Sequence, residues 1–174
     1  NTERIVEAVA EERVELGIIE GPAMRRDVKT KRMVQDEMVL IVSPNHAWAA
    51  RKAAAIAPAE LAKVPLLLRE RGSGSRRVVE RALKKMGLPL RSLKVAMELD
   101  STEAIISGVE AELGVGFVSR CAIGKVLRLG TVRIAAVEGL EILRDFSFVR
   151  LAGAEMTGTA ATFQRFAMGT VVTS

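Results

Sequence analysis

The chain has 174 residues, which is enough for one large domain or two small lobes with a sizeable core. Hydrophobic residues make up 49% of it, which argues against disorder, and no apolar run approaches the roughly 20 residues of a membrane-spanning helix. The formal net charge of +5 permits nucleic acid or an anionic ligand as a partner, although a solvated basic surface explains it more simply.

Cys121 is the single cysteine, so an internal disulfide is excluded and a reducing cytoplasm is the expected location. His46 is the single histidine, which leaves no plausible metal site and no Ser-His-Asp catalytic set. Aromatic residues make up only 3% of the chain, which argues against stacking platforms for single-stranded nucleic acid. We therefore expect no catalytic residue, no metal ligand and no cofactor.

In chain order, helical and strand patterns alternate, which is typical of a largely parallel α/β sheet. Apolar spacing predicts helices at 2–12, 75–86, 101–112, 121–127 and around 160–167, with a short helical turn at 58–63. Apolar runs predict strands at 16–19, 38–42, 65–68, 95–99, 116–119, 132–137 and 145–150. The basic segment 23–35 shows no regular pattern, so we expect it to be irregular.

A short passage of the chain occurs twice, about a hundred residues apart. NTERIV opens the first copy at 1–6 and STEAII opens the second at 101–106, and both continue to a glycine followed by an apolar run. Each copy predicts a capped helix, a turn and a buried strand, with Asn1 as the first N-cap and Asp100 in a capping box of the second. Two such units indicate two similar lobes, each pointing a helix N-terminus at a small anion in a cleft between them.

The segment RGSGSR at 71–76 is the sharpest local signal for a ligand, because it lies between an apolar strand and a helix. Gly74 lets the backbone approach a ligand closely, and the N–H groups and hydroxyls of Ser73 and Ser75 could hold a carboxylate, sulfate or phosphate. The arginines at both ends of the segment could add positive charge. The segment is neither a Walker motif nor a dinucleotide fingerprint. The alternative is that one of these serines merely caps the helix.

Thr2 and Thr102 occupy matching positions in the two copies, and each hydroxyl could face the cleft from the start of a helix. Ordinary hydrogen bonding within the first helical turn is the alternative. Glu20 ends a predicted strand, and the carboxyl ends of strands line ligand crevices in open α/β sheets. A simple turn is the alternative at that position.

Four strings of the sequence resemble the effector-binding domain of LysR-type transcriptional regulators. They are NTERIVEAVAEERVELGIIEGP, DEMVLIVSPNHAWA, LLLRERGSGSRRVVERALKKMGL and MELDSTEAIISGVEAELGVGFVSR. The resemblance runs from residue 1 to about residue 150 in order and spacing. Within the family, the chain is most similar to regulators of cysteine biosynthesis and of carbon-dioxide fixation.

The resemblance implies a fold like that of type 2 periplasmic binding proteins, in which two Rossmann-like α/β lobes are joined by two crossing strands and hold an effector between them. We expect residues 1–43 and 141–174 to form lobe I and residues 44–140 to form lobe II. At the matching positions, the resemblance places effector contacts at Thr2, Glu20, the segment 73–75 (Ser73, Gly74, Ser75), Ser101 and Thr102.

The family pattern also implies a strand and a helix of lobe I, and a winged helix-turn-helix, ahead of Asn1. We therefore expect an effector sensor of a bacterial transcription regulator that binds DNA only through that absent N-terminal domain. The full-length protein is expected to be a cytoplasmic homodimer or homotetramer without membrane contact. The alternative is a solute-binding protein of a transporter, which shares the lobe architecture, and an enzyme on the same fold would need a catalytic constellation that the sequence does not display.

Overall fold

The computed structural model describes residues 1–51 and 55–171. The helices are α1 (Thr2–Ala10), α2 (Gly74–Lys85), α3 (Thr102–Glu110), α4 (Gly124–Leu129) and α5 (Gly158–Val171), with the short 3-10 helices η1 (Pro58–Lys63), η2 (Leu90–Ser92) and η3 (Arg120–Ala122). The strands are β1 (Gly17–Glu20), β2 (Val28–Val42), β3 (Pro65–Arg69), β4 (Lys94–Leu99), β5 (Val115–Ser119), β6 (Arg133–Ala135) and β7 (Leu143–Leu151). The predicted α/β fold class is confirmed.

The chain divides into two compact units. Unit 1 comprises Asn1–Gln35, Gly72–Gly74 and Arg144–Ser174, and unit 2 comprises Asp36–Arg71 and Ser75–Leu143. Strand pairing is mixed rather than largely parallel as predicted, because β1 pairs with β7 and β2 pairs with β5 and β6 in antiparallel fashion. The parallel pairs are those that β3 makes with β4 and with β5.

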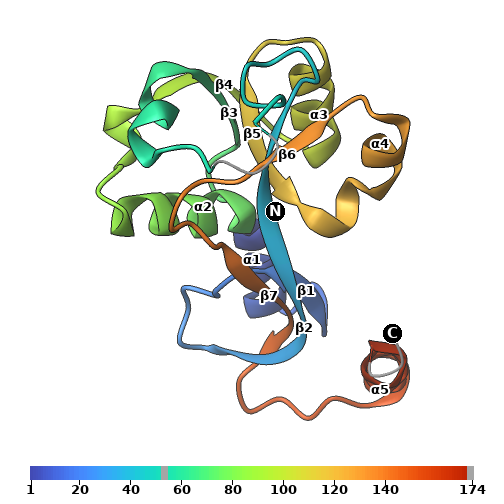
Figure 1. The fold of residues 1–174 in the computed structure, drawn as a ribbon. Helices are drawn as coiled ribbons and strands as arrows, with labels where there is room; N and C mark the ends of the chain where they lie inside the picture. Colours follow the sequence, from blue (N-terminus) through green and yellow to red (C-terminus); the bar gives the residue numbers. More distant parts are fainter. Residues whose placement is uncertain (52–54, 172–174) are drawn as a thin grey trace. The chain divides into compact units, whose positions relative to one another are not determined.

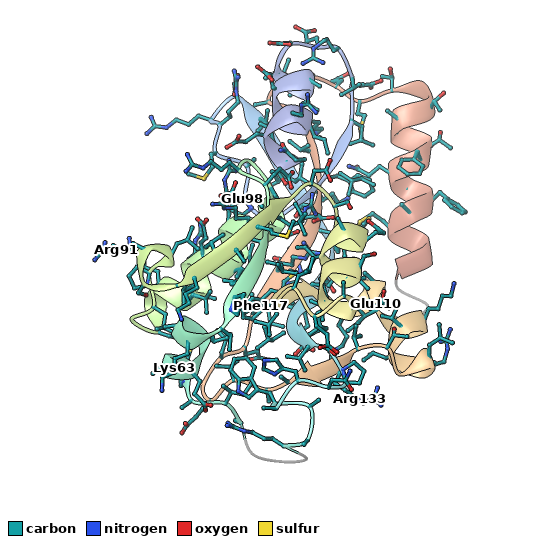
Figure 2. All side chains as sticks on the ribbon, turned by 90° about the horizontal axis from the view of Figure 1, so that it is seen from above. Lys63, Arg91, Glu98, Glu110, Phe117 and Arg133 are labelled. Carbon is teal, nitrogen blue, oxygen red and sulfur yellow. The ribbon has the colours of Figure 1, made fainter. Side chains whose placement is uncertain are left out.

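Unit 2 has a doubly wound arrangement around β3, which lies between β4 and β5 (Figure 1). Leu83 of α2 packs in one core with Leu66 of β3, whereas Ile105 of α3 packs in another core with Leu67 of β3. Because successive strand residues point to opposite faces, α2 and α3 cover opposite faces of the sheet. Phe117 of β5, labelled in Figure 2, belongs to the core on the α2 face. This order creates a topological switch point at the carboxyl ends of β3 and β5, where open α/β sheets bind ligands.

Unit 1 is built on the strand order β1-β7-β2, with α1 on one face. Val6 and Val9 of α1 form a core with Ile19 and Val149 from the strands. The neighbouring residue Phe148 makes an edge-to-face contact with Phe163 of α5, at 6.2 Å between ring centroids. Since residues 148 and 149 point to opposite faces, α5 lies on the face opposite α1.

Strand β2 corrects the prediction that residues 23–35 are irregular, because it begins at Val28 and runs without interruption to Val42. Its first half carries exposed polar side chains at 29–32, and its second half is buried. A strand with a solvated, charged half shows no apolar run, so pattern reading detected only the buried part.

Both copies of the repeat fold as predicted. Helices α1 and α3 have the same length, and each is followed by a buried or partly buried strand, β1 or β5. Asn1 caps α1 through a hydrogen bond from the Arg4 N–H. The cap of α3 is Ser101, which accepts from the Ala104 N–H, and not the predicted Asp100. Ser101 is one residue closer to the first helical turn, so its hydroxyl reaches the third N–H.

Candidate functional site

The start of α1, the end of β1 and the start of α2 meet within unit 1. The Thr2 hydroxyl is buried and donates to the backbone oxygen of Glu20 at 3.4 Å, which is long and therefore weak for such a bond. Gly74 lies against the same oxygen, since a Cβ atom at this position would be 1.5 Å from it and 2.5 Å from Thr2 Oγ1. Only glycine fits there. Three predicted site residues, Thr2, Glu20 and Gly74, are thus in contact.

The turn that precedes α2 lies against the N-terminus of α1. Gly72 adopts a φ of +85°, which favours glycine, and its backbone oxygen accepts the Glu3 N–H at 3.4 Å. The predicted site residue Ser73 follows in this turn and is only 2% exposed. The Glu3 N–H at the start of α1 is therefore held only weakly, by the Gly72 oxygen. A ligand with full negative charge would compete successfully for this N–H.

Arg144 adjoins this group of residues, and sequence reasoning did not predict it. Its side chain is 3% exposed, and its Nη1 donates to Glu20 Oε2 at 2.7 Å. The guanidinium carbon lies 4.9 Å from the ring centroid of Phe146, two residues along β7. Glu20 therefore touches Thr2 and Gly74 through its backbone oxygen and a buried cation through its carboxylate. A separation of 124 positions in the sequence rules out any local signal for the pair of Arg144 and Glu20.

The other predicted site residues, Ser75, Ser101 and Thr102, belong to unit 2. Strands β3 and β4 pair in parallel up to Arg69 and Leu99, so α2 and α3 both begin at the same edge of the sheet. Ser75 is buried in the first turn of α2, and Thr102 is half-buried at the start of α3. The two strand ends are tied by the bond from Arg69 Nη2 to the Asp100 oxygen, at 3.0 Å. Unit 2 thus groups three hydroxyl side chains in the first turns of α2 and α3, at the edge where open α/β sheets bind ligands.

Arg76, one of the two arginines expected to add charge to a ligand, is instead held inside unit 2. Its guanidinium is bound by Glu80 at 2.6 Å, by Glu98 at 2.9 Å and by the Arg69 oxygen at 3.0 Å. Figure 2 labels Glu98 on β4. Burial alone would lower the pKa of Arg76, but the hydrogen bonds that it donates to Glu80 and then to Glu98 outweigh burial and raise the pKa. Two carboxylates already neutralise this cation.

Within residues 1–51 and 55–171, no group of three or more His, Cys, Asp or Glu side chains is arranged to hold a metal ion. None of the helices in the same described part is long and apolar enough to cross a membrane. The exposed Cys121 follows Ser119, whose hydroxyl accepts the Cys121 N–H and donates to buried Asp36 at 2.9 Å.

Residues 1–170 match the family described as the LysR substrate binding domain. The chain belongs to this family. Among curated relatives, it is 33% identical over 148 residues to a "Probable RuBisCO transcriptional regulator" of Cyanidioschyzon merolae, covering 83% of this chain and 48% of that protein. It is 31% identical over 150 residues to the HTH-type transcriptional regulator CbbR of Xanthobacter flavus, covering 86% of this chain and 44% of that protein. This member of the LysR family therefore spans about half the length of these relatives.

Solved structures show the same fold. The CcmR regulatory domain of Synechocystis PCC6803 in complex with 2-PG superposes with a TM-score of 0.87 at 22% identity, covering 99% of this chain and 81% of that one. The effector binding domain of QuiR in complex with shikimate superposes with a TM-score of 0.83 at 17% identity, covering 98% and 78%. These LysR effector domains have the type 2 periplasmic-binding-protein fold, which confirms the predicted fold. The family match and the regulators among the relatives favour a regulator's effector-binding domain over a transporter's solute-binding protein.

Proposed function

We propose that this LysR effector-binding domain senses a small organic or inorganic anion and passes the signal to a DNA-binding winged helix-turn-helix in the full-length regulator. In this proposal, residues 1–43 and 141–174 form lobe I, residues 44–140 form lobe II, and the two lobes hold the anion between them. It also includes a cytoplasmic homodimer or homotetramer, DNA contact only through the N-terminal domain, and no enzymatic activity. A ligand that binds one lobe orientation better than another would shift the population of regulator states.

One observation supports an anionic effector: the predicted contacts gather at helix N-termini and carry hydroxyl groups, and a buried arginine that was not predicted adjoins one of them. Thr2, Ser75 and Thr102 all lie in the first turn of a helix, where N–H groups and partial positive charge favour anions. Arg144 adds a full positive charge beside Glu20 within unit 1. Two structural neighbours were solved with 2-PG and with shikimate, which makes these two compounds suitable first probes.

Thermal unfolding of the full-length regulator in the presence of 2-PG, shikimate, sodium sulfate or a neutral sugar tests this function. Ligand at 100 times its Kd should stabilise the native state by about 2.7 kcal/mol, which raises Tm by about 5–10 °C for a domain of this size. The neutral sugar at equal concentration is the control for non-specific stabilisation. Stabilisation by the neutral sugar alone would refute the anionic effector.

A gel-shift titration tests the assignment of DNA binding to the N-terminal domain. The 174-residue chain should bind duplex DNA weakly, without sequence preference, and with affinity that falls steeply between low and physiological salt. Specific readout requires side chains on base edges, which the scattered basic residues here do not present as one helix-turn-helix. Sequence-selective, nanomolar binding by this chain would contradict the proposal.

A further inference from the structure

The ion pair between Arg144 and Glu20 combines a fully buried cation with a partly exposed carboxylate. The Arg144 side chain is 3% exposed, whereas that of Glu20 is 38% exposed. We infer that the Arg144 guanidinium binds the effector's carboxylate or phosphate group, and that Glu20 is the counter-ion that this group displaces. This inference rests on the proposed function and names the residue that recognises the charge of the effector.

Arg144 requires an anionic partner in every state of the domain. Removing a guanidinium from water costs several kcal/mol, and an opposite charge must compensate for it. One face of the guanidinium lies against Phe146. Arginine binds carboxylate and phosphate groups best through its in-plane N–H groups, as Arg144 already binds Glu20. Exchanging the Glu20 carboxylate for an effector anion keeps the charge of Arg144 balanced.

Glu20 can release its side chain without moving its backbone. Its backbone oxygen contacts the Thr2 hydroxyl and lies directly beside Gly74, and its N–H lies in β1, paired with Phe146 of β7. Gly21 follows with a φ of +105°, so the strand ends at this residue. The carboxylate therefore can rotate toward solvent while the framework that positions Thr2 stays in place.

The displaced carboxylate leaves a position that suits an anion. That position adjoins Arg144, and the Glu20 backbone adjoins the Thr2 hydroxyl at the start of α1. The α1 helix N-terminus contributes partial positive charge there. An effector anion would thus replace the Glu20 carboxylate as the counter-ion of Arg144, close to the start of α1.

Isothermal titration of the full-length regulator with 2-PG, shikimate and sodium sulfate, comparing wild type with Arg144→Gln, Arg144→Lys and Glu20→Gln, tests this exchange. Arg144→Gln should weaken binding of the recognised anion by about ten- to a hundredfold, the loss expected for a charge-assisted hydrogen bond. Arg144→Lys should retain part of the affinity, since lysine keeps the charge but not the planar fork. Glu20→Gln should strengthen binding about two- to fivefold, because the competing carboxylate is gone.

Arg32 and Asp145 supply matched controls in the same unit, because they form an exposed ion pair at 2.8 Å. Arg32→Gln and Asp145→Asn should leave the affinity unchanged. The Tm of Glu20→Gln should also rise more with sulfate than that of Asp145→Asn, and this measurement needs no stable Arg144 variant. The exchange is wrong if the anion binds Arg144→Gln as tightly as wild type, or if it binds Glu20→Gln more weakly than wild type. If wild type binds no anion, the proposed function itself is wrong.

Discussion

The two copies of the repeat are nearly identical in backbone geometry although they belong to different units. In both, the helix ends with the same pair of hydrogen bonds: Glu12 N–H to Val9 and Arg13 N–H to Ala8 in the first, at 3.1 and 2.9 Å, and the corresponding bonds in the second, at 3.0 and 2.9 Å. The glutamates that follow the helices, Glu12 and Glu112, have φ values of 57° and 61°. This is the Schellman ending, with glutamate in the position that usually holds glycine.

The copies differ in what surrounds them. Strand β1 stands at one end of the strand order, pairs with β7 and exposes Ile18 to 36%. Strand β5 lies between β2 and β3, and every one of its residues is buried. Both Glu12 and Glu112 are exposed, but Glu112 accepts hydrogen bonds from Ser43 and Asn45, at 3.2 and 2.6 Å. Packing against neighbouring strands therefore stabilises the second copy of the motif more than the first.

In each copy of the repeat, one isoleucine of the helix packs under the strand that follows. Replacing these two isoleucines with alanine should show the largest difference in stability between the copies. Ile105 is 1% exposed and Ile5 only half-buried. Ile105→Ala should cost about 3 kcal/mol and Ile5→Ala about 1 kcal/mol, since the cost of a cavity grows with burial. Urea unfolding followed by the fluorescence of Trp48, the single tryptophan, reports on unit 2, and amide exchange in β1 reports on unit 1. Equal costs would mean that burial does not distinguish the two copies.

Adding a methyl group to the strand glycines should have the next largest effect. A Cβ atom at Gly116 would lie 2.5 Å from Ile105 Cγ2, and one at Gly17 would lie 2.4 Å from Ile5 Cγ2. We expect Gly116→Ala to cost about 2–3 kcal/mol, because its isoleucine cannot move within a filled core, and Gly17→Ala to cost about 1 kcal/mol. Gly124→Ala is the control, because a Cβ atom there meets nothing within 4 Å. Denaturation midpoints at constant m-value measure all three.

Replacing the left-handed glutamates with glycine should give small effects of opposite sign. Glu12→Gly should stabilise unit 1 by about 0.5–1 kcal/mol, because glycine adopts positive φ without a steric penalty. Glu112→Gly should destabilise unit 2 by about 1 kcal/mol, because the lost hydrogen bonds to Ser43 and Asn45 outweigh the relief of strain. Amide exchange in β1 and β5 provides the measurement. A stabilising Glu112→Gly would show that those two bonds contribute less than the relief of backbone strain.

Sequence reading found the parts of the candidate site that local patterns encode and missed those that depend on distant residues. The repeat and the glycine-serine turn pointed to Thr2 and Gly74, and the structure places both against Glu20. Whether these residues, with Ser73, Ser75, Ser101 and Thr102, contact an effector stays a prediction. The pairing of Arg144 with Glu20 carried no local signal, because a lone arginine at a strand start looks like any surface cation.

By itself, the sequence determined the order of helices and strands, the Asn1 cap of α1 and the close approach of the backbone at Gly74. These features depend on apolar spacing, on residues within one or two helical turns, and on the absence of a Cβ atom. Only the tertiary structure decided which copy of the repeat is enclosed by neighbouring strands, and that residues 28–35 extend β2. It also decided that Arg76 is neutralised by Glu80 and Glu98, and that Arg144 is buried against Glu20. Burial and charge pairing depend on contacts between segments far apart in the chain, and a single sequence does not reveal which of its many carboxylates will meet a given arginine.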